Sequence, residues 1–200
     1  GDPRALHFDI TSKRISNRIL NKHVVNTRSL SAYVWSFCSQ INDFELQHHN
    51  VFFNDNYKSE FEDIERNKMP SNPTLYLCAE DRGFGKKNIK NEKFEIIMNG
   101  APFDGGKINE KEEYQQCYST TFSKLNQIGL IFRTKPTMET LTTPQKFEKM
   151  FPMSKGSLYG QNPNSIMTTF RRPKIKTKIP NLFLVGGGVH PGPGIPMAAL

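Results

Sequence analysis

The chain ends in an apolar run that passes into a segment crowded with glycine and proline. Leu182–Val185 is followed by Gly186-Gly187-Gly188-Val189-His190, and then by alternating proline and glycine up to Pro196. Glycine lacks the side chains that would collide with a ligand, and proline stiffens a loop that binding would otherwise have to order. We expect a buried strand, a preformed turn whose backbone N–H groups can face a ligand, and the start of a helix. The composition is equally compatible with a tight strand-to-helix turn that binds nothing.

The residues before this segment predict a mixture of strands and helices. Aromatic and β-branched stretches predict strands at 29–37, 46–53, 73–79 and 94–99, short strands at 130–132 and 137–141, and strand edges at 5–10. We place the turn between the first two long strands at 40–44. Helical spacing and capping signals predict helices at 56–68, at 110–129 after the N-cap Asn109, and at 145–150. Segment 81–91 is predicted to be a solvated loop. Amphipathic helices covering one face of a mostly antiparallel sheet make the predicted fold class α+β.

Charge and hydropathy argue against a nucleic-acid site and against a membrane-spanning segment. The formal net charge is +8, but lysine and arginine are spread along the whole chain. A basic stretch before the last predicted strand comprises Arg171, Arg172, Lys174, Lys176 and Lys178. It lacks the interleaved aromatic residues of a nucleic-acid site, so we predict that it is a solvated face. Contact with flavin phosphate or lipid head groups is the alternative. No apolar run of about 20 residues is present, so any membrane contact is expected at the surface.

The histidine pair, the cysteines and the aromatic residues could have functional roles, but ordinary structural roles explain them equally well. His48 and His49 are adjacent, and because neighbours on a strand point to opposite faces, no metal site is expected. The cysteines are predicted to be reduced, buried and small hydrophobic in character, and they are Cys38, Cys78 and Cys117. Aromatic residues at strand period two are interpreted as core packing or as the lining of a polyene tunnel, and these are Tyr33, Trp35, Phe37, Phe52 and Phe53.

The final segment resembles the C-terminal flavin-binding signature of the phytoene desaturase family, a strand followed by G-G/A-x-x-H-P-G-x-G-[IV]-P. The resembling sequence is NLFLVGGGVHPGPGIPMAAL. Upstream, RSLSAYVWSF, FELQHHNVFF, PTLYLCAEDR, GSLYG at 156–160 and FRRP at 170–173 also resemble this family. They look closest to the branch that desaturates hydroxylated carotenoids at the 3,4 position, the hydroxyneurosporene or methoxyneurosporene desaturase type. The resemblance is weak over residues 1–28 and 81–91.

The resemblance implies a part of an FAD-dependent carotenoid desaturase. It divides the chain into a connection from an upstream flavin domain at 1–28, a portion of an antiparallel-sheet substrate domain at 29–178, and the return segment of a Rossmann-like FAD domain at 179–200, α/β in the full enzyme. No GxGxxG that follows a strand occurs here, so the N-terminal half of the FAD site is expected to be missing. The residues implied to contact FAD are Gly186, Gly187, Gly188, Val189, His190, Pro191, Gly192, Gly194, Ile195, Pro196 and Met197. No catalytic residue is assigned.

The implied reaction is hydride transfer from a carotenoid to FAD, which introduces a C=C bond, in an enzyme peripheral on the cytoplasmic face of a membrane. This chain alone is expected to be inactive. A phytoene desaturase or a retinol saturase-like flavoprotein remains an alternative, whereas HPGPGIP argues against an amine oxidase. A non-catalytic membrane-surface binding domain is the alternative of another class, although none of the predicted helices is strongly basic on one face.

Overall fold

A computed structural model describes residues 2–5, 28–86, 89–162 and 172–194. The chain divides into two compact units, and each is treated by itself. Unit 1 comprises 1–31, 102–104 and 144–200, and unit 2 comprises 32–101 and 105–143. The predicted strand edges at 5–10 lie almost entirely outside the described residues.

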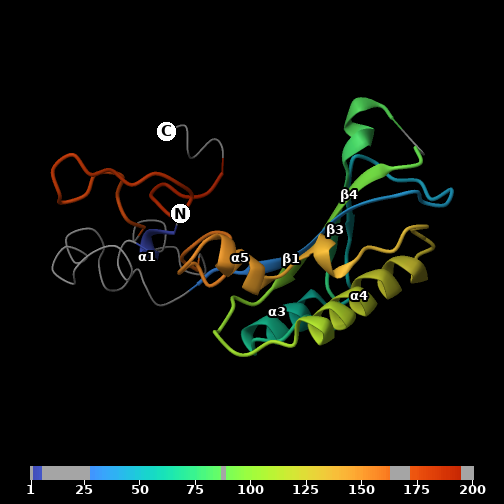
Figure 1. Ribbon diagram of the computed structural model, residues 1–200, viewed down its shortest axis with the longest axis horizontal. Coiled ribbons are helices and arrows are strands. Elements are labelled where there is room, and N and C mark those ends of the chain that lie inside the picture. The colour runs from blue at the N-terminus through green and yellow to red at the C-terminus, as the bar shows by residue number, and fades with distance from the viewer. Residues whose placement is uncertain (1, 6–27, 87–88, 163–171, 195–200) are drawn as a thin grey trace. The chain divides into compact units, whose positions relative to one another are not determined.

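Unit 2 is built on a five-stranded sheet with the order β2-β3-β4-β1-β5 (Figure 1). The strands are β1 (Ser31–Ser39), β2 (His49–Phe52), β3 (Leu75–Ala79), β4 (Glu92–Gly100) and β5 (Leu141–Thr142). β3 pairs antiparallel with both β2 and β4, and β1 pairs antiparallel with β5. The mixture of helices with an antiparallel sheet confirms the predicted α+β class.

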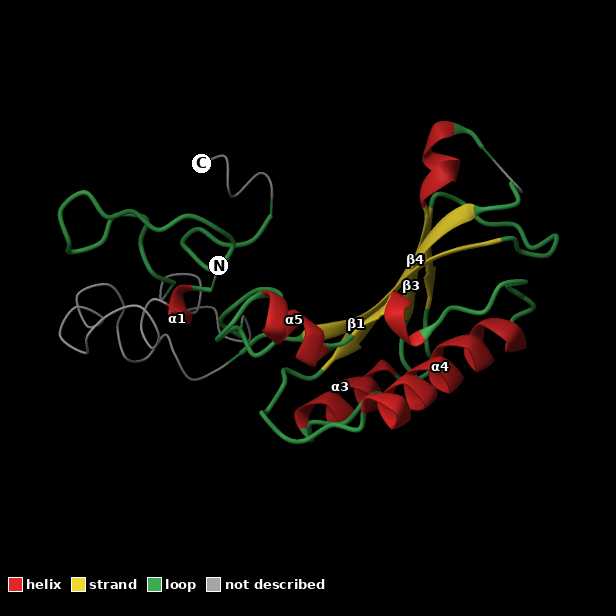
Figure 2. Cartoon of the chain, in the orientation of Figure 1, coloured by secondary structure: helices red, strands yellow, loops and turns green. Residues whose placement is uncertain are grey.

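Two helices accompany this sheet, and four short helical segments complete the described elements (Figure 2). The longer ones are α3 (Tyr57–Glu65) and α4 (Glu110–Gln127). The short ones are α1 (Pro3–Ala5), α5 (Pro144–Met150) and the 3-10 turns η3 (Glu80–Phe84) and η4 (Met138–Thr140). Asn109 caps α4 as predicted, because its side-chain oxygen accepts the backbone N–H of Lys111 at 3.2 Å. No helix among the described residues is long and apolar enough to cross a membrane.

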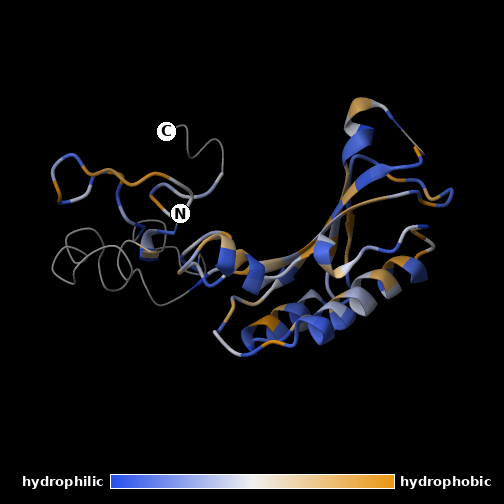
Figure 3. Cartoon of the chain, viewed as in Figure 1, coloured by the Kyte–Doolittle hydropathy of each residue, from blue (hydrophilic) through white to orange (hydrophobic). Residues whose placement is uncertain are grey.

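The core of unit 2 lies between β1 and α4. Tyr33, Trp35 and Phe37 alternate along β1 and are all buried. Trp35 makes edge-to-face contacts with Tyr114 and Phe122 of α4, with ring centroids 5.7 and 5.4 Å apart. Figure 3 shows the mixed polar and apolar surface of α4 that such one-sided packing requires. These three rings are therefore part of the hydrophobic core, which was one of the two interpretations of the aromatic residues. Phe53, by contrast, is largely exposed.

Several sequence predictions differ from the structure in extent. β1 and β2 belong to one sheet, but β3 and β4 lie between them, so 40–44 is not a hairpin turn. The predicted strand at 130–132 is only a bridge between Ile41 and Phe132, and most of 137–141 is the 3-10 turn η4. Residues 182–185 form a single bridge, between Phe183 and Lys176. An apolar run becomes a strand only where a neighbouring backbone supplies hydrogen bonds along its length.

The segment predicted as a solvated loop, 81–91, is exposed over much of its described length, but its Arg82 forms a buried ion pair with Glu92. Arg82 Nε lies 2.5 Å from Glu92 Oε1, and both side chains are buried. Arg82 Nη1 also donates to the carbonyl oxygen of Leu46 at 2.7 Å. This one guanidinium joins the chain before β2, the turn η3 and the first residue of β4. Charged groups are expensive to bury unless they are paired, so the position of η3 is tightly constrained.

We predict that Arg82→Met destabilises the protein by about 3–5 kcal/mol, because it leaves the Glu92 carboxylate buried without its partner. The double variant Arg82→Met/Glu92→Met should recover much of this loss, because no unpaired charge remains. Urea unfolding followed by circular dichroism measures both. Lys58→Ala, which removes an exposed ion pair with Glu62, is the control and should change little. A single Arg82 variant as stable as the parent chain would contradict the prediction.

Candidate functional site

A two-armed segment leads into the glycine-rich turn of unit 1. Leu184 N–H donates to the carbonyl oxygen of Ile175 at 2.8 Å, and Thr177 N–H donates to that of Leu182 at 3.3 Å. The two arms therefore run antiparallel, with the bridge between Lys176 and Phe183 inside them. Leu184 packs in a small apolar cluster with Val189. The chain thus enters the turn in a defined direction although no extended strand precedes it.

The buried side chain of Arg172 binds the backbone of the glycine-rich turn. Its Nη1 donates to the carbonyl oxygen of Gly187 at 2.7 Å, and its residue is 6% exposed. Burial lowers the pKa of Arg172 from its ordinary value, which is far above neutrality. The next residue, Pro173, accepts the N–H of His190 at 2.9 Å. The prediction of a solvated basic stretch is thus wrong for Arg172.

The remaining members of the basic stretch divide into two groups. Lys174, Lys176 and Lys178 are exposed, as predicted. Arg171 lies outside the described residues.

The glycine triplet is divided between internal packing and open space. A Cβ on Gly188 would lie 2.8 Å from Pro3 Cδ, and one on Gly187 would lie 3.3 Å from Pro193 Cβ. A Cβ on Gly186 would meet no atom within 4 Å, although its φ of +132° disfavours any other residue. Gly188 and Gly187 thus permit close packing of the chain itself, whereas the backbone at Gly186 is open to an external group.

The residues predicted to contact a cofactor accordingly differ in exposure. Gly186, Gly187, His190 and Gly194 are exposed, Gly188 and Pro191 are half-buried, and Val189 and Gly192 are buried. Ile195, Pro196 and Met197, together with the predicted helix start, lie outside the described residues. The exposed members carry no bulky side chain apart from His190.

A second glycine motif of unit 1, at 156–160, is organised by buried serines. Ser29 and Ser157 join their hydroxyl groups at 2.9 Å, and Ser31 Oγ donates to the carbonyl oxygen of Gly156 at 2.6 Å. Ser29 N–H donates to the carbonyl oxygen of Gly160 at 2.9 Å. A Cβ on Gly160 would lie 3.5 Å from Gly188 Cα. The two glycine motifs that resemble the same family are therefore neighbours.

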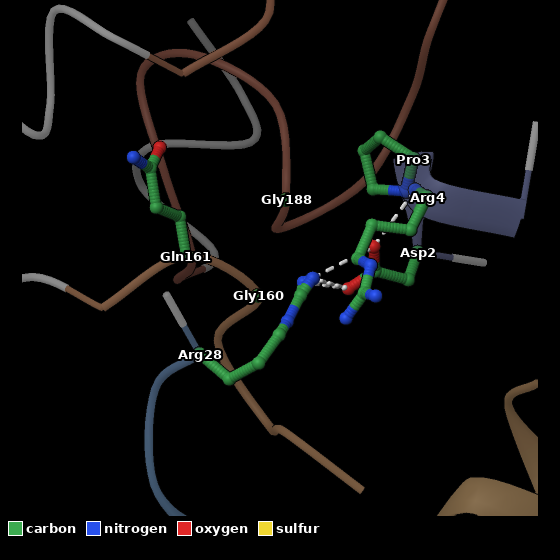
Figure 4. Close-up of a pocket in the computed structure, with 7 residues that line it drawn as sticks. All are labelled: Asp2, Pro3, Arg4, Arg28, Gly160, Gln161 and Gly188. Carbon is green, nitrogen blue, oxygen red and sulfur yellow. Dashed lines mark hydrogen bonds and ion pairs between the residues drawn. The ribbon is translucent and has the colours of Figure 1, made fainter. Parts of the chain in front are cut away.

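Beside Gly160 and Gly188, a buried ion pair joins Arg28 to Asp2 (Figure 4). Arg28 Nη1 lies 2.9 Å from Asp2 Oδ2 and Nη2 lies 3.1 Å from Asp2 Oδ1, a bidentate arrangement. Desolvation lowers the pKa of Arg28, and the Asp2 carboxylate partly opposes that shift. The cavity here is only about 10 Å³, room for one water molecule. The pair therefore serves packing of unit 1, and nothing in its local sequence pointed to it.

Unit 2 carries a larger cleft of about 540 Å³. Its lining is mostly polar or charged: Asp63, Asn67, Lys68, Ser71, Lys107, Asn109, Glu112, Glu113 and Gln116, with Tyr33, Met69 and Ile108 as the apolar members. Such a lining differs from the apolar wall that a polyene requires. We therefore assign no carotenoid to this cleft.

The cysteines follow their prediction only in part. Cys117 is buried, Cys78 is half-buried and Cys38 is exposed on β1. Burial raises the pKa of Cys117 to about 12, which fits a small core residue. The alternation along β1 explains Cys38, because its neighbour Phe37 occupies the core side.

We predict that Gly156→Ala destabilises unit 1 more than Gly160→Ala does. Both glycines have φ near +70°, so each substitution costs about 1 kcal/mol in backbone strain. At Gly156 the new Cβ would also collide with the backbone of Pro144, whose carbonyl carbon lies 2.9 Å away. Thermal unfolding monitored by circular dichroism compares the two variants. Equal melting temperatures would show that the Pro144 contact relaxes freely.

Comparisons with known proteins find similarity along the whole chain. No family model matches it. It is 47% identical over 200 residues to hydroxyneurosporene desaturase from Cereibacter sphaeroides and 41% identical over 198 residues to the protein of that name from Rhodobacter capsulatus. It is 31% identical over 182 residues to 1-hydroxycarotenoid 3,4-desaturase from Flavobacterium sp.. These matches cover 100%, 99% and 90% of this chain, but 40%, 39% and 37% of the relatives. The chain is therefore a homologue of the carotenoid desaturases that corresponds to about two fifths of their length.

Proposed function

We propose that this chain is part of an FAD-dependent desaturase that introduces a C=C bond at the 3,4 position of a hydroxylated or methoxylated carotenoid. The observation that carries the proposal is the 47% identity along the entire chain to a protein named hydroxyneurosporene desaturase. The match to 1-hydroxycarotenoid 3,4-desaturase supports the same substrate class. A general phytoene desaturase or a retinol saturase-like protein is less well supported by these names.

The turn of unit 1 is the part of the chain that we assign to FAD. When bound, FAD accepts the hydride that leaves the carotenoid. The open backbone of Gly186 would lie against the cofactor, and Arg172 would keep the neighbouring backbone in place through the Gly187 carbonyl. His190 is exposed beside them, within reach of the same ligand. The residues that abstract a proton remain unassigned.

The two compact units suit two roles in such an enzyme. We propose that unit 2, with its antiparallel sheet, is the central part of the substrate domain portion that we place at 29–178, of which residues 144–178 belong to unit 1. The segment 179–200 belongs to unit 1 and corresponds to the return of the FAD domain. Residues 1–28, the proposed connection from an upstream flavin domain, also belong to unit 1. The proposed GxGxxG half of the cofactor site would come from other parts of the enzyme.

The decisive test expresses the complete reading frame that contains this chain. Supplied with a hydroxylated carotenoid in a host that lacks other desaturases, the protein should yield a product with a longer conjugated system, detected by a red-shifted absorption spectrum after chromatography. Gly186→Val should reduce the flavin absorbance per mole of purified enzyme at least tenfold, because its side chain enters the open space beside the backbone. Gly105→Val is the matched control, since Gly105 also has positive φ and no neighbour within 4 Å but lies in unit 2. Full flavin content in Gly186→Val would contradict the assignment of the turn.

We also propose that the enzyme contacts the cytoplasmic face of a membrane through residues 174–185. Ile175, Phe183 and Val185 are 48%, 58% and 85% exposed in this segment. Lys174, Lys176 and Lys178 lie at alternate positions of one arm and are exposed as well. Exposed apolar side chains beside lysines match the interface of an anionic membrane, where apolar groups insert and ammonium groups meet phosphates.

Vesicle flotation of the complete protein tests this contact. We expect binding to vesicles that contain anionic lipid, weaker binding to purely zwitterionic vesicles, and at least a fivefold loss with Phe183→Ser. Lys58→Ser, at an exposed lysine of α3 in unit 2, is the control. Flotation that is unchanged in Phe183→Ser would show that another part of the enzyme covers these residues.

A further inference from the structure

His48 and His49 do not obey the alternation expected of neighbours on a strand. β2 begins at His49, and His48 occupies a bend immediately before it. The two imidazole centroids lie only 4.0 Å apart, with the rings inclined by 73°. The two side chains therefore lie close together and not on opposite faces, because only His49 is within the strand.

Cys78 completes the group from the neighbouring strand. It is the register partner of His49 in the antiparallel pair of β2 and β3, and directly opposed residues share a face of the sheet. Its Sγ lies 3.9 Å from His48 Nε2. One ligand atom from each of His48, His49 and Cys78 lies within 4.8 Å of the others. A tetrahedral zinc ion bound by nitrogen and sulfur requires about 3.6 Å between those two ligand atoms, so only small side-chain movements are needed.

Both imidazoles are oriented by hydrogen bonds at Nδ1. His48 Nδ1 lies 3.1 Å from the carbonyl oxygen of Ala79, which can only accept, so this nitrogen carries the proton. His49 Nδ1 lies 2.7 Å from the hydroxyl oxygen of Tyr76. Metal-binding histidines commonly donate one ring N–H to a carbonyl or other oxygen while the second nitrogen holds the ion. For His48 this leaves Nε2, the atom that lies 3.9 Å from Cys78 Sγ, to coordinate an ion. For His49, Nε2 is available when Nδ1 donates to the Tyr76 hydroxyl.

The position of the His48 ring depends on a glycine. A Cβ on Gly83 would lie 2.6 Å from His48 Cε1 and 2.7 Å from its Nδ1. Gly83 follows Arg82, whose buried pair with Glu92 fixes η3, and Arg82 also holds the carbonyl of Leu46, two residues before His48. The backbone on both sides of the His48 ring is thus held by one guanidinium. This supplies a preorganised pocket for the ring.

From this arrangement we propose that His48, His49 and Cys78 bind a zinc ion, with water as the fourth ligand. Two imidazoles and one thiolate are donors that zinc favours, and three protein ligands with one open position form a tetrahedral site. His49 is exposed and the other two residues are half-buried, so the ion is reached from solvent. The bound ion joins β2 to β3 at the edge of the sheet. The site is independent of the flavin chemistry proposed for unit 1.

The test titrates the complete protein, purified without a histidine tag and treated with a chelator, with Zn²⁺ in a calorimeter and with Co²⁺ in a spectrophotometer. We expect one equivalent of Zn²⁺ to bind, and Co²⁺ to produce the thiolate charge-transfer absorption and strong visible bands of a tetrahedral site. Cys78→Ser should abolish the charge-transfer absorption and weaken Zn²⁺ binding at least tenfold. Cys38→Ser, at the exposed cysteine of β1, should leave both signals unchanged.

Gly83→Ala tests the geometry without removing a ligand. It should weaken Zn²⁺ binding at least tenfold, because the new methyl group displaces the His48 ring, while circular dichroism remains that of the folded protein. Tyr76→Phe should weaken binding less, since His49 would lose only its orienting hydroxyl group. The proposal is overturned if no Zn²⁺ binds, if Cys78→Ser binds it as tightly as the parent, or if Cys38→Ser removes the cobalt absorption. Binding of several equivalents without a charge-transfer band would identify adventitious surface sites and would equally overturn it.

Discussion

The buried pair of Arg82 and Glu92 determines the arrangement of one end of the sheet in unit 2. A guanidinium and a carboxylate removed from water need close geometry to offset their lost hydration, so neither can shift without the other. Arg82 also donates to the carbonyl oxygen of Leu46, which lies in the connection before β2. Three stretches that are distant in sequence are therefore located by a single side chain. Gly83 and His48 come together as a result.

Much of the fold could be predicted from short-range patterns. The alternation of Tyr33, Trp35 and Phe37 predicted β1, and the capping residue Asn109 with the apolar stripe after it predicted α4 within a few residues. These patterns report which face of an element is buried. They do not report which strands are neighbours, because the order depends on contacts between distant residues such as the pairing of β3 with β4. Arg82 was assigned to a solvated loop for the same reason, since its partner lies ten positions away in another element.

The candidate sites show a similar division. The glycine and proline residues of the final segment pointed to a turn, and the structure contains a turn there. The pattern did not distinguish glycines needed for internal packing, such as Gly188 against Pro3, from those exposed to a ligand, such as Gly186. The burial of Arg172 could not be predicted, because the lysines that follow it in the sequence are exposed. In β2, the rule of alternating faces misled because the strand was expected from residue 46 but begins at His49, which leaves His48 outside it.

The discontinuity of unit 1 has a consequence for biosynthesis. Its hydrogen bond between Ser29 and Ser157 joins residues 128 positions apart, and all of unit 2 lies between them in the sequence. On the ribosome, unit 2 can acquire its sheet and core while the early residues of unit 1 still await their partners. Closing contacts across so long an intervening chain is entropically costly, so unit 1 should be the later part to form. A nascent chain whose Thr143 has just emerged from the ribosome would thus contain a folded unit 2, while unit 1 still lacks the contacts made by residues 144 onward.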